Sequence, residues 1–171
     1  DDTSGEELVL VESGAIIEYM MQNYGKNSSL IIPKTGSQQE RDYRYWLHFS
    51  EGSLMSPLLL RLIFHRIKTT PVPFFVKPIT KAIANKVLSE FVNPNIERLL
   101  DFIDASLKGK QWFLGDQLSG ADIQMSFPLE ASVASGLIDD QYPEIQSYVE
   151  RIHRQPSYQE ALLKGGKYDY A

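Results

Sequence analysis

The stretch QWFLGDQLSGADIQMSF, residues 111–127, decides the fold class of this chain. Gly115 and Asp116 are typical of a tight turn, and the segment Ser119–Asp122 that follows has the form of a capping box. In a capping box, a Ser and an acidic residue three positions later bind the free backbone N–H groups at the start of a helix. The stretch therefore predicts a turn followed by a helix, with Asp122 in a structural role.

A long helix is predicted upstream of this stretch. Ser37 and Glu40 form another capping box, after which apolar residues repeat with helical spacing to about Ile67. Pro57 predicts a bend in this helix, because proline lacks the N–H that continues the hydrogen-bond ladder. Trp46 lies on the apolar side of the helix, and we expect it in the core.

Further helical signals predict a mainly α fold. Residues 79–103 carry apolar side chains at helical spacing, and we expect one long helix that kinks at Pro94. Downstream, Pro143 and Pro156 each stand at the expected first turn of another helix. No strand pattern is visible after the first dozen residues.

The start of the chain has a different character. Leu8–Val11 is a short apolar run that predicts a strand, and Ser13–Tyr24 predicts a helix. A lone strand cannot form a stable sheet, so we expect the rest of an α/β domain to precede this sequence. Residues 26–36, rich in Asn, Ser, Pro and Gly, predict a linker. We therefore divide the chain into residues 1–25, the linker, and a helical domain over residues 37–171.

Glu12 and Ser13 stand where the predicted strand meets the predicted helix. A helix start presents unpaired N–H groups and partial positive charge, which together attract a carboxylate. Ser13 adds a hydroxyl, and Glu12 adds an acceptor for an ammonium group, so the pair suits the α-amino-acid end of a small ligand. The alternative is that Ser13 only caps the helix and Glu12 is only solvated.

Three segments resemble the glutathione transferase family. VESGAIIEYM, from Val11 to Met20, resembles the junction in which Glu/Gln-Ser of that family grips the γ-glutamyl end of glutathione. FLGDQLSGADI, from Phe113 to Ile123, resembles the folding signal of the family's all-helical domain. RYWLHFSEGSLMSPLLL, from Arg44 to Leu60, resembles a fungal and bacterial branch. Together these segments extend the resemblance over nearly the whole chain.

The resemblance implies a fold and a ligand. The fold would be an all-helical C-terminal domain preceded by a remnant, one strand and one helix, of a thioredoxin-like α/β domain. Glutathione would be the co-substrate, held by Glu12 and Ser13. No residue matches the family's thiol-activating Tyr, Ser or Cys, so we assign no catalytic residue and expect that position to lie in the missing N-terminal part.

The resemblance also implies a small hydrophobic electrophile and a homodimer. The candidate electrophile pocket consists of Phe49, Glu51, Ser53 and Leu54. The alternative is that Phe49 and Leu54 only pack in the core and that Glu51 and Ser53 only face solvent. The full protein would conjugate the glutathione thiolate to the electrophile, as in detoxification, or reduce a peroxide or disulfide. The alternative is a non-catalytic scaffold or protein-interaction module of the same fold.

Composition excludes several other classes. A net charge of −5 argues against a nucleic-acid binder. The most apolar window, SLMSPLLLRLIF, is interrupted by Pro57 and Arg61 and is far short of the ~18 apolar residues of a membrane span. The three His residues share no ligand spacing, so we expect no metal site. The absence of Cys suits a reducing compartment, and we expect a cytoplasmic location.

One local feature departs from the acidic average of the chain. We interpret it as the solvated basic face of two helices and their connection. Its members are Arg61, His65, Arg66, Lys68, Lys77 and Lys81.

Overall fold

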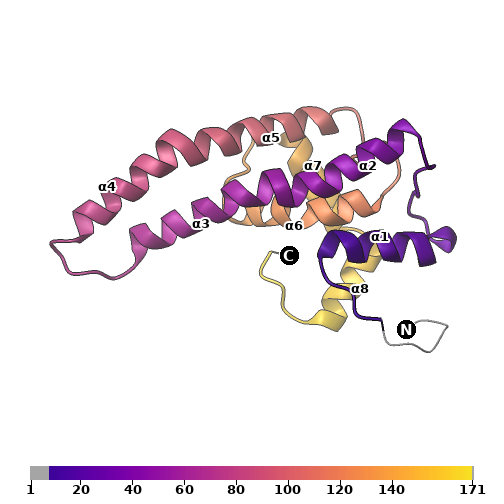
Figure 1. Cartoon of the computed structure of the whole chain (residues 1–171), viewed down its shortest axis with the longest axis horizontal. Helices are drawn as coiled ribbons and strands as arrows, with labels where there is room; N and C mark the ends of the chain where they lie inside the picture. Colours follow the sequence, from indigo (N-terminus) through magenta and orange to yellow (C-terminus); the bar gives the residue numbers. More distant parts are fainter. Residues whose placement is uncertain (1–7, 171) are drawn as a thin grey trace.

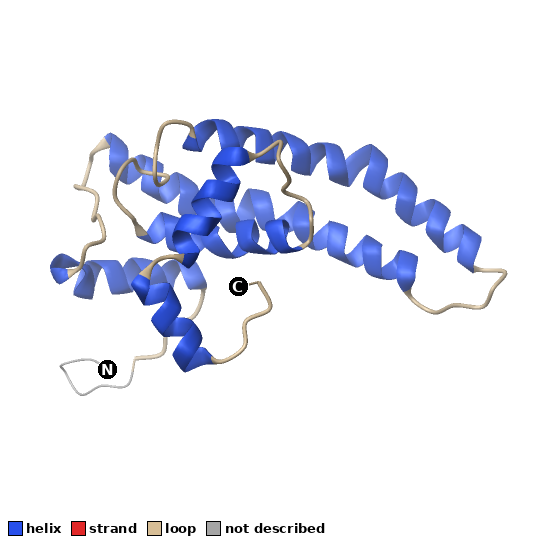
Figure 2. Cartoon of the chain, turned by 180° about the vertical axis from the view of Figure 1, so that it is seen from behind, coloured by secondary structure: helices blue, strands red, loops and turns tan. Residues whose placement is uncertain are grey.

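The computed structural model describes residues 8–170, and this part of the chain contains helices and loops but no strand (Figure 2). The mainly α fold class is confirmed. The helical elements are α1 (Ser13–Tyr24), η1 (Gly25–Asn27), α2 (Gln38–Phe49), η2 (Ser50–Met55), α3 (Ser56–Thr69), α4 (Lys77–Val87), η3 (Leu88–Val92), α5 (Asn93–Leu107), α6 (Gly120–Ala134), α7 (Pro143–His153) and α8 (Pro156–Gly165).

The strand predicted over Leu8–Val11 does not form. Val9 and Val11 are 75% and 70% exposed, so this apolar run packs against little of the described chain. A strand exists only through hydrogen bonds to a neighbouring strand, and the residues described here provide none. The helix predicted after it, α1, begins and ends where the sequence indicated.

Two long helical runs lie side by side and form the length of the molecule (Figure 1). One consists of α2, η2 and α3, and the other of α4, η3 and α5. A π-helical turn lies near each of the two prolines where a bend or kink is expected, directly before the helix that contains Pro57 or Pro94. Proline cannot donate the next hydrogen bond of an α-helix, and a π turn is a common form of the local irregularity that results.

The hydrophobic core surrounds α6. Ala121, Met125 and Leu129 on this helix are completely buried, as is Tyr148 of α7. Trp46 is 6% exposed and packs into the same cluster, as predicted. The core thus fixes α6 between α2 and α7, and α1 also packs on α6.

The predicted helix start at Ser119 and Asp122 is confirmed. The buried Asp122 carboxylate accepts hydrogen bonds from the Ser119 N–H (2.8 Å), the Ser119 hydroxyl (2.7 Å) and the Phe113 N–H (2.9 Å). Burial raises the pKa of the Asp122 carboxyl, although these hydrogen bonds oppose the rise. The Tyr148 hydroxyl donates to the backbone carbonyl of Asp122 (2.7 Å), so the start of α6 is also joined to α7.

Candidate functional site

The start of α1 has the backbone geometry of a strained, open helix end. Glu12 is the residue before the helix, and its φ of 70° lies in the left-handed region that favours glycine. Ser13 is the first helical residue rather than the cap, and no side chain caps the helix. The N–H groups of the first turn therefore have no side-chain partner, which leaves them available to an anion.

Ser13 is connected to the helical domain by a residue that the sequence analysis did not identify. The side-chain nitrogen Nε2 of Gln124, on α6, donates to the Ser13 hydroxyl (2.9 Å) and to Oε1 of Glu51 in η2 (2.9 Å). Gln124 is 5% exposed, although the groups it bonds lie nearer the surface. Three segments far apart in the sequence thus meet at one amide group.

The chemistry of these groups fixes the direction of each hydrogen bond. The Glu51 carboxylate, when ionised, only accepts, so the atom of Gln124 that faces it must be the NH₂ group. Both hydrogens of that group are then used, one by Glu51 and one by Ser13. The Ser13 oxygen therefore accepts, and its own proton is free to be donated to a ligand oxygen.

The four residues of the predicted electrophile pocket have different surroundings. Glu51 is joined to the Ser13 site through Gln124, and Ser53 is exposed. Phe49 is 7% exposed and Leu54 is completely buried, and both belong to the hydrophobic core. Leu54 therefore has no surface that a ligand could contact, and its side chain can only pack beneath the residues that line a pocket.

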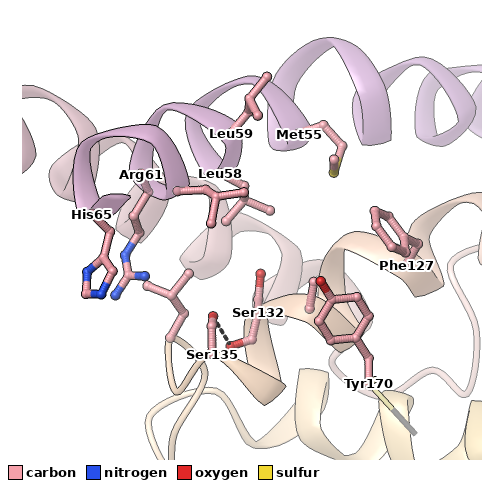
Figure 3. A pocket seen from close by; sticks show the side chains of 12 residues that line it. Met55, Leu58, Leu59, Arg61, His65, Phe127, Ser132, Ser135 and Tyr170 are labelled. Carbon is pink, nitrogen blue, oxygen red and sulfur yellow. Dashed lines mark hydrogen bonds between the residues drawn. The ribbon is translucent and has the colours of Figure 1, made fainter. Parts of the chain in front are cut away.

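A cavity of about 350 Å³ lies between α3, the second half of α6 and the C-terminal tail (Figure 3). Most of its lining is apolar, and Arg61 and His65 stand together on α3, away from Phe127 and Tyr170. The lining residues are Met55, Leu58, Leu59, Arg61, Leu62, His65, Phe127, Ala131, Ser132, Ser135, Leu137 and Tyr170. An apolar cavity with a few polar groups is suited to a small hydrophobic molecule.

Two residues of the cavity lining follow residues of the Ser13 site along the same helical runs. Met55 follows Glu51 by four residues on the same helical run, and Phe127 follows Gln124 by three residues on α6. Residues three or four apart on a helix share a face. A ligand held at Ser13 could therefore reach into the cavity along these two faces.

The C-terminal tail is held in place by a buried carboxylate. The Tyr168 hydroxyl donates to Oε2 of Glu130 (2.7 Å), and Glu130 is only 2% exposed. His153 also approaches Glu130, with 3.3 Å between Nε2 and Oε1. Tyr170, two residues beyond the anchored Tyr168, packs edge-on against Phe127 with ring centroids 5.9 Å apart.

Residues 8–170 contain neither a metal-binding cluster nor a membrane-spanning helix. No group of His, Asp or Glu side chains within this range could hold a metal ion. Among the helices of the same range, none combines the length and apolar character that crossing a membrane requires.

Comparisons with known proteins relate this chain to one family. The family model described as the C-terminal domain of glutathione S-transferase matches residues 66–156, more than half of the chain. Glutathione S-transferase 1 of Saccharomyces cerevisiae is 28% identical over 160 residues, which cover 92% of this chain and 68% of that protein.

Solved structures show the same fold. A glutathione S-transferase from Actinobacillus pleuropneumoniae matches with a TM-score of 0.71 and 28% identity, over 99% of this chain and 69% of that chain. The glutathione transferase URE2P6 from Phanerochaete chrysosporium, in complex with oxidized glutathione, matches with a TM-score of 0.71 and 16% identity, over 95% of this chain and 70% of that chain. This chain spans about two thirds of the length of these relatives.

Proposed function

The chain belongs to the glutathione S-transferase family through its C-terminal domain, and we propose that the protein binds glutathione at the start of α1 and transfers its thiolate to a small apolar electrophile. The observation that carries the proposal is the Ser13–Gln124–Glu51 connection beside an uncapped helix start. Reduction of a peroxide or a disulfide by the same bound thiol is the second form of this chemistry.

The Ser13 site would hold the γ-glutamyl end of glutathione. The α-carboxylate of that group would accept from the Ser13 hydroxyl and from the N–H groups of the first turn of α1. Its ammonium group would lie near the Glu12 carboxylate. Glu12 keeps a strained backbone at this position, and such strain persists in proteins mainly where function requires the geometry. A non-catalytic scaffold has no use for this arrangement.

The residues of this chain would bind and orient glutathione, and they would not activate its thiol. A free thiol has a pKa of about 8.5, and a hydrogen-bond donor or positive potential beside the sulfur lowers it. We place that donor in a segment outside this sequence. Residues 1–25 would be the last part of the glutathione-binding domain, residues 26–36 the linker, and residues 37–171 the helical domain.

The electrophile would occupy the cavity between α3, α6 and the tail. Met55 and Phe127 line this cavity. We expect them to bring it close to the Ser13 site, because they follow Glu51 and Gln124 on the same helical runs, so that the sulfur of bound glutathione can meet the electrophile.

None of the four predicted pocket residues, Phe49, Glu51, Ser53 and Leu54, lines this cavity. Of the four, we retain Glu51, because it is linked to the Ser13 site through Gln124. We also propose that the protein forms a homodimer and that it is located in the cytoplasm.

The test is the affinity for glutathione of the full-length protein and of Ser13→Ala. Losing a hydrogen bond to a charged group should weaken binding by ~1.5–3 kcal/mol, or about 10- to 150-fold in Kd. Ser126→Ala, which alters a hydroxyl bonded only within α6, is the matched control. Calorimetry that shows equal affinity for Ser13→Ala and the unaltered protein would refute the assignment of the site.

A further inference from the structure

The basic residues noted in the sequence belong to a protruding arm formed by α3, α4 and the loop between them, residues 56–87 (Figures 1 and 2). Residues 52–89 contain no Asp or Glu, so all 22 acidic residues of the chain lie elsewhere. The Lys and Arg residues of this stretch are Arg61, Arg66, Lys68, Lys77, Lys81 and Lys86. The arm is therefore strongly cationic on a protein whose net charge is negative.

Carboxylates of the described residues do not pair with these positive charges. Across residues 8–170, none of the six forms an ion pair with a carboxylate. Arg66, Lys77, Lys81 and Lys86 are exposed, and Arg61 lines the cavity at the base of the arm. Uncompensated charge of one sign attracts a surface of the opposite sign.

The tip of the arm presents aromatic side chains to solvent. Phe74 and Phe75 lie in the loop, 87% and 65% exposed, with their rings edge to face at 5.6 Å. Ile79 and Ile83 continue this apolar surface along α4, at 60% and 55% exposure. Large apolar side chains exposed together at one end of a charged arm indicate an interaction site.

The shape and composition of the tip favour one kind of partner. Figure 1 shows the loop at the far end of a two-helix projection. Phe74 and Phe75 belong to this loop, and neither lines one of the described pockets. Lys68 and Lys77 flank the loop on either side. Exposed aromatic rings beside Lys and Arg are typical of segments that rest in the interface of a bilayer, where the rings enter the acyl boundary and the cations meet the headgroups.

We propose that this arm docks the protein on an anionic lipid surface, with Phe74 and Phe75 inserted and the basic residues of α3 and α4 against the headgroups. Docking would be peripheral and reversible. Attraction to anionic lipid acts within about one Debye length, so binding should weaken as salt is raised. Aromatic insertion should make binding depend on both phenylalanines rather than on charge alone.

The test is cosedimentation of the full-length protein with vesicles of phosphatidylcholine alone or with roughly 30% phosphatidylserine. We expect binding only to the anionic vesicles, with a loss of about tenfold or more in partitioning for Phe74→Ser/Phe75→Ser and for Lys77→Glu/Lys81→Glu. Two control variants, Leu163→Ser and Lys108→Glu/Lys110→Glu, alter exposed residues away from the arm and should bind as the unaltered protein does.

Two results would overturn the proposal. One is the absence of binding to anionic vesicles at low salt, or binding that the arm variants leave unchanged. The other is a change of oligomeric mass in the Phe74→Ser/Phe75→Ser variant without vesicle binding by the unaltered protein. That second result, measured by light scattering, would assign the same surface to contact with another copy of the chain.

Discussion

At the scale of single residues, the Ser13 site shows how one amide can set the role of a hydroxyl. A serine hydroxyl can donate or accept, and its partner decides which. The Gln124 amide occupies the acceptor side of Ser13 at 2.9 Å and is itself oriented by Glu51. The proton of Ser13 is thereby left for a ligand bound at the start of α1, so Gln124 acts as a positioning residue.

Gln124 acts on the ligand only through Ser13. Replacing it should therefore weaken glutathione binding indirectly. In Gln124→Leu, the Ser13 hydroxyl is free to rotate and to donate elsewhere, and Glu51 loses its partner. We expect the Kd for glutathione to rise about 5- to 20-fold, which corresponds to one hydrogen bond of ~1–1.8 kcal/mol. Isothermal titration calorimetry measures this change.

A second replacement separates positioning from packing at the same residue. Gln124→Met keeps the length and volume of the side chain and removes both donors, so it should bind glutathione as weakly as Gln124→Leu. Unfolding by urea reports whether either variant is merely unstable. If the methionine variant kept full affinity, the hydrogen bonds to Ser13 and Glu51 would have no part in binding.

At the scale of elements, local signals in the sequence were sufficient for helices and insufficient for the strand. The starts at Ser37 and Ser119 depend on residues within three positions of each other, and both form. Leu8–Val11 has the composition of a strand, but its hydrogen bonds must come from another chain segment, which residues 8–170 do not contain. An irregular turn near Pro57 and near Pro94 is predictable from proline, whereas its π-helical form depends on packing.

Replacing Asp122 at the start of α6 should lower stability by more than the loss of a helix cap alone. Asp122 binds the N–H of Phe113 as well as the N–H and hydroxyl of Ser119, and its side chain is completely buried. Asp122→Ala would leave two buried N–H groups without an acceptor. We expect the free energy of unfolding to fall by about 2–5 kcal/mol.

Urea unfolding followed by far-UV circular dichroism measures this loss. Asp116→Ala, in the exposed turn just before α6, is the control and should change the free energy of unfolding by less than ~0.5 kcal/mol. A midpoint for Asp122→Ala equal to that of the control variant would mean that the buried carboxylate does not hold the helix start.

At the scale of the whole molecule, the candidate site is assembled from segments that sequence reasoning could not bring together. Ser13 and Gln124 are 111 residues apart, and no local pattern distinguishes Gln124 from other polar residues of α6. The cavity likewise combines α3, α6 and a tail residue, Tyr170. Glu12 and Ser13 could be predicted because a helix start is a local feature, whereas their partners depend on how the helices pack.

Two tyrosines near Glu130, Tyr158 on α8 and Tyr168 in the C-terminal tail, should make the stability of the fold depend on alkaline pH. Burial raises the pKa of Tyr158 to about 12, and the negative charge of Glu130 adds to the rise. Burial and the hydrogen bond to Glu130 also raise the pKa of Tyr168. The folded state therefore keeps these protons above pH ~10, where an unfolded chain loses them. Stability should be fully present below about pH 10 and should fall as pH rises beyond it.

Tyr168→Phe tests this dependence and the role of the tail together. At neutral pH the variant should unfold more easily by about 1–2 kcal/mol, because Glu130 loses the hydrogen bond from the tail. Above pH ~10 its stability should fall less steeply with pH than that of the unaltered protein, because one of the two tyrosines with a raised pKa is gone. Tyr170→Phe leaves the Tyr168–Glu130 bond in place and is the control. Equal slopes for Tyr168→Phe and the unaltered protein, in urea unfolding at several alkaline pH values, would show that this phenol does not link the tail to the body.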